Sequence, residues 1–228
     1  MTVCIAALSD DKKKAVLVAD KLITYQTTFP FQVNGEGKIF HINDNVKVMY
    51  SGRENDALLI IEKVKRGVDS KKWITEIAEY VNQKHLEYLN DIIVAMHLTS
   101  RGIKSITEYY KNKELNLDAA TNSNIDLAIT THNLNSALNL IVCGKDSDGL
   151  FKLYFLNNNP RVAPLLLNIG YAAIGSGANH ALYSIIHSSV EYNHSLTAAQ
   201  VKEMLLEAKK KAEKASDVGV ETDIVIME

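Results

Sequence analysis

Strand-length apolar runs separated by polar turns dominate the start of the chain. Residues 3–8 and 15–20 form two such runs around a charged turn, which predicts a β-hairpin. Residues 21–37 are polar and irregular, which predicts a loop. Residues 38–42 and 46–51 predict a second hairpin, because the Asn-Asp-Asn sequence between them is a strong turn signal.

The period of the pattern then changes from strand-like to helical. Apolar residues recur at helical spacing from Glu54, and a longer helix follows until Gly102 interrupts it. The inward stripe of this longer helix is predicted to consist of Ile74, Ala78, Val81, Tyr88, Ile92 and Met96. Residues 103–113 predict a further helical piece, whereas residues 112–139 have no clean period beyond 125–130.

Strands return in the second half of the chain and are followed by helices. Residues 140–156 predict a hairpin and residues 171–174 a short strand, which leads into a helix over 178–192. Thr197 and Gln200 have the spacing of a capping box and open another helix, before a last strand over 223–227. The inward residues of the helix that begins after Thr197 are predicted to be Val201, Leu205, Ala208 and Ala212. The solvated face of this helix is predicted to include Lys209, Lys210 and Lys211. This order favours two stacked antiparallel sheets with helices on both outer faces.

Composition narrows the class of protein. A chain of 228 residues can build one substantial core, so we expect a single domain over residues 1–228. The formal net charge of -2 gives no bulk attraction for nucleic acid. The apolar runs are too short to span a membrane, and the N-terminus lacks the pattern of a secretory signal. Cys4 and Cys143 lie inside apolar runs, which predicts buried free thiols and a cytoplasmic protein.

Thr2 is the first candidate for chemistry. It follows Met1 directly, and a small residue at this position favours removal of the methionine. A threonine exposed in this way carries a hydroxyl nucleophile and a free α-amine that can take its proton. A Met-Thr start in front of a strand has no catalytic meaning by itself, so the hypothesis depends on partners supplied further along the chain.

Short motifs downstream of Thr2 supply such partners in a recognisable order. They are Val18-Ala19-Asp20, Gly37-Lys38-Ile39, Ser51-Gly52, Val142-Cys143-Gly144-Lys145-Asp146 and Ile174-Gly175-Ser176-Gly177. With these motifs, over most of its length, the chain resembles the proteasome β-type subunits of the N-terminal-nucleophile hydrolases, and especially the simple bacterial proteasome-like proteins. The resemblance implies an α+β fold, the four-layer αββα sandwich, which agrees with the order of elements above.

The resemblance assigns the central roles to three residues. Thr2 matches the nucleophile, Lys38 the lysine beside its hydroxyl, and Asp20 the acid that orients this lysine. A threonine hydroxyl is a poor nucleophile unless a nearby base accepts its proton, and the base must be held in place. The sequence leaves two candidates for the base, Lys38 and the α-amine of Thr2.

Further positions complete the expected catalytic network. Gly52 matches the glycine whose backbone N–H meets the developing oxyanion, and Ser176 the serine near the α-amine. Asp217 is the candidate for the remaining acid, although its interval to the last strand is short, so that Asp217, Ser216 or neither fills this place.

Two positions match substrate-binding residues of the family, and two features depart from it. Thr24 matches a threonine that pairs with the substrate backbone, and Tyr50 falls at the base of the specificity pocket, where it would favour small side chains. Leu22 stands where the family often has an arginine, and residues 101–139 are longer and more polar than their counterpart.

The resemblance implies a threonine peptidase that acts on peptides or unfolded proteins inside a self-assembled ring. No ATPase regulator is identified by the sequence, and we expect no cofactor and no metal, because the histidines lack ligand spacing. Two alternatives stay open: a catalytically silent ring subunit that keeps Met1, and an amidohydrolase or acyltransferase that acts on a small amide or a specific peptide.

Overall fold

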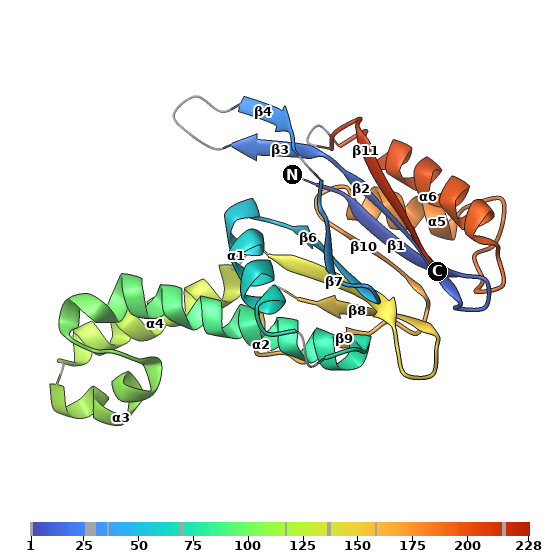
Figure 1. The fold of residues 1–228 in the computed structure, drawn as a ribbon. Coiled ribbons are helices and arrows are strands. Elements are labelled where there is room, and N and C mark those ends of the chain that lie inside the picture. Colours follow the sequence, from blue (N-terminus) through green and yellow to red (C-terminus); the bar gives the residue numbers. More distant parts are fainter. Residues whose placement is uncertain are drawn as a thin grey trace.

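Two antiparallel sheets are stacked face to face, and helices cover the outer face of each (Figure 1). The structure is a computed structural model, and it describes residues 2–25, 31–35, 37–68, 71–116, 118–135, 138–157, 159–215 and 218–228. The arrangement is the expected αββα sandwich, so the fold class predicted from the sequence is confirmed.

The first sheet contains the N-terminal hairpin at its centre and has the strand order β10-β1-β2-β11. Its strands are β1 (Cys4–Ser9), β2 (Lys14–Asp20), β10 (Tyr171–Ile174) and β11 (Thr222–Met227). Cys4 pairs with Ala19, and Thr222 pairs with Asp20. This register brings the start of β1, the end of β2 and the chain that enters β11 to one end of the sheet.

The second sheet has the order β5-β6-β7-β8-β9. Its strands are β5 (Ile39–Asn43), β6 (Val46–Ser51), β7 (Asn139–Lys145), β8 (Phe151–Leu156) and β9 (Leu165–Leu166). Both predicted hairpins in this region are therefore confirmed, whereas the short edge strand β9 was not predicted.

The central strands are apolar on both faces because each face meets a different layer. Along β1, Ile5 and Ala7 face the helices, while Cys4, Ala6 and Leu8 face the other sheet, as the period of two in a strand requires. The core between the sheets is closed by residues of both, including Leu17, Met49, Ile141, Cys143, Phe151 and Leu153.

Two helices cover each sheet. The helices α1 (Glu54–Lys65) and α2 (Ile74–Ile93) pack on the second sheet, and α5 (Ala178–Ile186) and α6 (Ala198–Ala212) on the first. The capping box predicted at the start of α6 is present. The helix predicted over 178–192 ends earlier, at Ile186, and the prediction of its end was wrong. The Tyr192 hydroxyl lies beyond the helix, within hydrogen-bond distance of the carbonyl oxygens of Leu8 at 2.9 Å and Gly170 at 2.7 Å.

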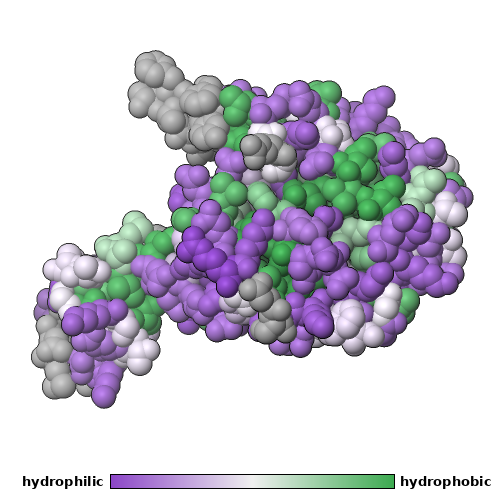
Figure 2. Space-filling model, viewed as in Figure 1, coloured by the Kyte–Doolittle hydropathy of each residue, from purple (hydrophilic) through white to green (hydrophobic). Residues whose placement is uncertain are grey.

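A helical arm projects from the sandwich beyond α2 (Figures 1 and 2). It contains a π-helical turn (Val94–Leu98), a 3₁₀ turn (Thr99–Arg101), α3 (Ile106–Asn116) and α4 (Ala119–Asn135). Together with the end of α2 the arm has its own small core, made of Leu89, Ile93, Leu98, Tyr109, Ile125 and Ile129. The helix α4 occupies much of the segment in which the sequence showed no clean period.

Three other expectations were wrong. Residues 21–37 contain a hairpin, β3 (Leu22–Tyr25) and β4 (Phe31–Asn34), and are not simply a loop. Met96 was placed on the inward stripe of α2 but is 61% exposed, because the chain leaves α-helical geometry at Val94. Lys209 was placed on a solvated face but is 1% exposed.

Candidate active site

Thr2 lies just before β1 and is held from one side by the glycine-flanked serine. Its backbone nitrogen donates to Ser176 Oγ at 3.3 Å, and its carbonyl accepts from the Gly177 amide at 3.2 Å. Gly175 has φ +99°, and a Cβ at this position would lie 2.0 Å from the Thr2 carbonyl oxygen. Only glycine allows this close approach. The segment Gly175-Ser176-Gly177 therefore packs against the Thr2 backbone and hydrogen-bonds to it.

Asp20 lies at the end of β2 and is fully buried. Its Oδ1 accepts from the Val3 amide at 2.8 Å, and its Oδ2 accepts from the amides of Leu22 at 3.1 Å and Gly219 at 3.2 Å. The carboxylate is thus tied to the residue that follows Thr2 and to the segment that precedes β11. Backbone donors around a carboxylate satisfy its lone pairs and fix its orientation.

Lys38 completes this cluster just before β5. Its Nζ lies 3.0 Å from both carboxylate oxygens of Asp20 and 2.7 Å from the Leu22 carbonyl. These oxygens match the three hydrogens of an ammonium group. Leu22 contributes its amide and its carbonyl to the cluster, so the Lys38–Asp20 pair forms with a leucine at this position.

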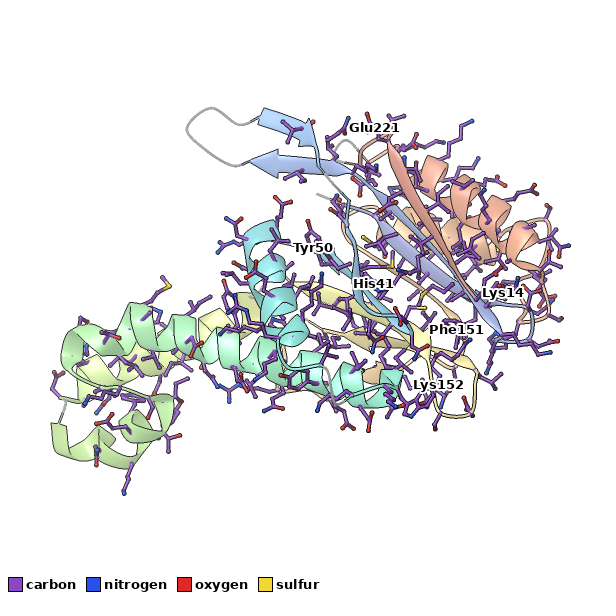
Figure 3. The ribbon with its side chains drawn as sticks, viewed as in Figure 1. Lys14, His41, Tyr50, Phe151, Lys152 and Glu221 are labelled. Atoms are coloured by element: carbon purple, nitrogen blue, oxygen red, sulfur yellow. The ribbon has the colours of Figure 1, made fainter. Side chains whose placement is uncertain are left out.

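The end of β6 provides the next expected positions. Gly52 follows β6 with φ +126° and is exposed. Tyr50 is buried, and its ring lies 5.6 Å from that of Phe40 on the side of α1 and α2. Figure 3 shows Tyr50 toward the end of the sandwich that carries the N-terminus, with Lys152 toward the opposite end.

The two cysteines are free and buried, as predicted. Cys4 Sγ donates to the Tyr50 carbonyl at 3.2 Å and so links β1 to β6 across the two sheets. Burial raises the pKa of the Cys4 thiol above its ordinary value, and burial does the same for Cys143. Both therefore act as protonated core side chains.

The structure describes the remaining predicted residues only in part. Thr24 lies in β3 opposite Gln32 of β4, and the structure describes its backbone alone. Asp217, its alternative Ser216, and Met1 lie outside the described residues.

Sequence reasoning missed Gly219, whose amide approaches Asp20 across 199 positions of the chain. It also missed Asp223, whose Oδ2 would lie 2.7 Å from a Cβ at Gly37. Gly37 has φ +121°, and a glycine directly before the site lysine was the available signal for a close approach.

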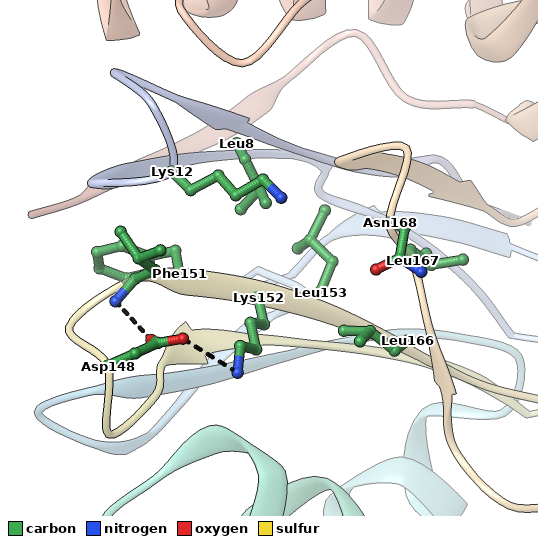
Figure 4. Close-up of a pocket in the computed structure, with 10 residues that line it drawn as sticks. Leu8, Lys12, Asp148, Phe151, Lys152, Leu153, Leu166, Leu167 and Asn168 are labelled. Atoms are coloured by element: carbon green, nitrogen blue, oxygen red, sulfur yellow. Dashed lines mark hydrogen bonds and ion pairs between the residues drawn. The ribbon is translucent and has the colours of Figure 1, made fainter.

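A small hollow between the sheets is separate from this cluster. Its lining residues include Leu8, Lys12, Phe151 and Lys152 (Figure 4). Leu8 lies near the end of β1, whereas Thr2 precedes the start of this strand. Within the described ranges, no group of three or more His, Cys, Asp or Glu side chains is placed to hold a metal ion. No helix in the described part of the chain is long and apolar enough to cross a membrane.

The two stacked sheets and their two helical layers form the fold of a proteasome β-type subunit. Among solved structures, the chain is similar to eukaryotic HslV from Trypanosoma brucei, at 16% sequence identity and a TM-score of 0.57. The similarity covers 100% of this chain and 99% of that one. No protein-family model and no curated protein matches the sequence.

Proposed function

We propose that the protein is a threonine peptidase whose nucleophile is Thr2 after removal of Met1, and that it works in a ring of identical subunits. The observation that carries this proposal is the position of the buried Asp20 carboxylate. It accepts a hydrogen bond from the Val3 amide, next to Thr2, and pairs with the Lys38 ammonium. The proteasome β-type fold of the whole chain supports the same reaction class.

The geometry favours the α-amine of Thr2 as the general base. The three hydrogens of Lys38 are directed at Asp20 and at the Leu22 carbonyl, so its ammonium serves as a fixed positive charge. Ser176 Oγ lies 3.3 Å from the Thr2 nitrogen and can hold the freed amine in place. An ordinary α-amine has a pKa of about 7.7–8.0, which suits proton transfer near neutral pH.

The reaction then follows from these positions. The Thr2 hydroxyl adds to the scissile carbonyl and passes its proton to the α-amine, while the Gly52 N–H stabilises the oxyanion. Collapse of the tetrahedral intermediate breaks the peptide bond, and the α-amine returns the proton to the departing amine. Water then hydrolyses the ester on Thr2 by the same route and restores the hydroxyl.

Thr24 and Tyr50 are proposed to select the substrate. Thr24 would pair with an extended peptide as an added strand, and Tyr50 would limit the depth of the specificity pocket. Cleavage of peptides with alanine or valine before the cut is expected to exceed cleavage after phenylalanine. A clear preference for large aromatic residues would contradict this role of Tyr50.

Intact mass with a threonine-directed probe tests the proposal. The purified protein should lack the mass of Met1 and gain one equivalent of an epoxyketone or β-lactone probe. Thr2→Ala should abolish this gain, whereas Thr99→Ala, at an exposed threonine of the helical arm, should keep it. A retained methionine without labelling would show a silent subunit, and labelling with turnover of small amides alone would show an amidohydrolase.

Ring assembly requires a separate measurement. Light scattering during size-exclusion chromatography should give a mass that is a multiple of the 25.3 kDa chain. A monomer at micromolar concentration would contradict the assembly but leave the chemistry at Thr2 open to the labelling test.

A further inference from the structure

Lys209 is a buried charge on the inward face of α6. The other buried residues of this helix are Val201, Met204, Leu205, Ala208 and Ala212. Its neighbours Lys210 and Lys211 are exposed, as expected for lysines in the last turn of a helix. A lysine is almost never fully buried unless it is paired, so this position calls for a physical reason.

The ammonium of Lys209 joins α6 to the segment that leads into β11. Its Nζ lies 2.6 Å from Glu213 Oε1, one turn further along the helix, and 2.5 Å from the Val220 carbonyl oxygen. Glu213 offsets the charge, and the carbonyl offers an acceptor outside the helix. An apolar side chain of similar length would fill the same space without the cost of desolvating a charge. What the ammonium adds is the bond to Val220.

The segment that Lys209 holds is the one that reaches Asp20. The Gly219 amide, directly before Val220, donates to Asp20 Oδ2 at 3.2 Å. The segment also runs close to β3, since a Cβ at Gly219 would lie 2.6 Å from Leu22 Cβ. Val220 is 78% exposed, so its own packing does not fix its carbonyl, whereas Val218 on the other side of Gly219 is buried against the helices.

We propose that Lys209 is a positioning residue of the active site. By anchoring the Val220 carbonyl it sets the Gly219 amide against Asp20, and Asp20 in turn orients Lys38, whose ammonium is part of the proposed site. Lys209 itself touches no reacting atom. Its effect on turnover rests on the proposed peptidase function, whereas its effect on the Gly219 amide does not.

The test compares Lys209→Met with two controls on the same helix. Lys210→Met removes an exposed ammonium one position away, and Val201→Ala weakens the packing of α6 about two helical turns before Lys209. The first readout is hydrogen exchange of the Gly219 amide, measured by NMR. The second is kcat and KM for a peptide substrate across pH, with stability measured for each variant.

Lys209→Met should raise the exchange rate of the Gly219 amide by at least tenfold, beyond any change in Val201→Ala. It should also lower kcat by roughly tenfold to a hundredfold with little change in KM, since small displacements of catalytic groups have costs of this size. Its acid limb of kcat against pH should shift, because the charges around the α-amine have moved. Lys210→Met should match the wild type in all readouts.

The proposal would be overturned if the exchange rate of the Gly219 amide and kcat changed only in proportion to stability. Lys209→Met and Val201→Ala would then behave alike. If Lys209→Met fails to fold, Glu213→Ala serves instead. Without its counter-charge the ammonium should leave the buried site for water and release Val220, and an unchanged Gly219 amide in this variant would count against the proposal. If the wild type has no peptidase activity, the proposed function fails, and exchange of Gly219 alone decides the role of Lys209.

Discussion

Replacement of Asp20 by asparagine should have a large cost in stability that a second substitution can partly recover. The asparagine keeps the shape of the side chain, but its amide nitrogen cannot accept hydrogen bonds. Asp20→Asn therefore leaves the Lys38 ammonium, whose side chain is 3% exposed, without a charged partner. At least one of the backbone donors at Val3, Leu22 and Gly219 also loses its acceptor.

The structure sets the order of the effects. Breaking a buried pair by removing one partner costs about 3–5 kcal/mol. Lys38→Met should cost less, about 1.5–3 kcal/mol, because the carboxylate keeps its backbone donors and loses only the bonds to the ammonium. The double variant should be more stable than Asp20→Asn alone, since methionine removes the unpaired charge. Against a total stability of about 5–15 kcal/mol, these differences are easily measured.

Urea unfolding of the four proteins, followed by circular dichroism at pH 7.5, measures these terms. Labelling by a threonine-directed probe should be lost in both single variants. It should not return in the double variant, because the second substitution restores stability but not the site residues. A cost of Asp20→Asn below about 1 kcal/mol, as for an exposed ion pair, would refute the reasoning. So would a double variant less stable than either single one.

Three further predictions concern other parts of the molecule. Gly175→Ala should cost more stability than Gly149→Ala and should abolish probe labelling. Both glycines have positive φ, but only at Gly175 would a Cβ meet the Thr2 carbonyl; equal melting temperatures would contradict this. Burial lowers the pKa of His85 to about 4. The stability that depends on a neutral His85 is therefore fully present above pH 6.5 and is lost as the pH falls toward 4. The wild type should therefore lose about 2 kcal/mol between pH 7.5 and 5 that His85→Leu does not lose, at about 1.36 kcal/mol per pKa unit. Parallel pH curves of urea stability would exclude this linkage. Thr197→Ala should cost about 1 kcal/mol by removing the side-chain cap of α6, measured by thermal unfolding; an unchanged midpoint would argue against the capping box in solution.

Elements with a clear period were predictable from the sequence. The hairpin of β1 and β2 and the strands β6, β7 and β8 are apolar runs between turn residues, and they occur where expected. The hairpin of β3 and β4 escaped prediction because each of its strands has only four residues, too few to show a clear period. The helix α4 escaped because seven of its 17 residues are asparagine or threonine, and because Ile125 and Ile129 are the buried apolar residues among its described side chains.

Some contacts of the candidate site were also predictable from local motifs, whereas others depend on tertiary structure. Asp20 and Lys38, two of the residues that the motifs singled out, form a buried ion pair. No local pattern, however, shows that Gly219 will donate to Asp20, because the contact depends on β11 pairing with β2. The burial of Lys209 could not be predicted either, since three consecutive lysines ordinarily indicate a face in water, and the acceptor at Val220 is set by tertiary structure.

The donor that Gly219 offers to Asp20 has a consequence for biosynthesis. Asp20 belongs to the hairpin of β1 and β2, whereas Gly219 lies 199 positions later in the chain and therefore leaves the ribosome after it. An incomplete chain can therefore pair β1 with β2 and still lack one of the bonds that fix its key carboxylate. The proposed peptidase would then stay idle until β11 has docked beside β2 and Gly219 has reached Asp20.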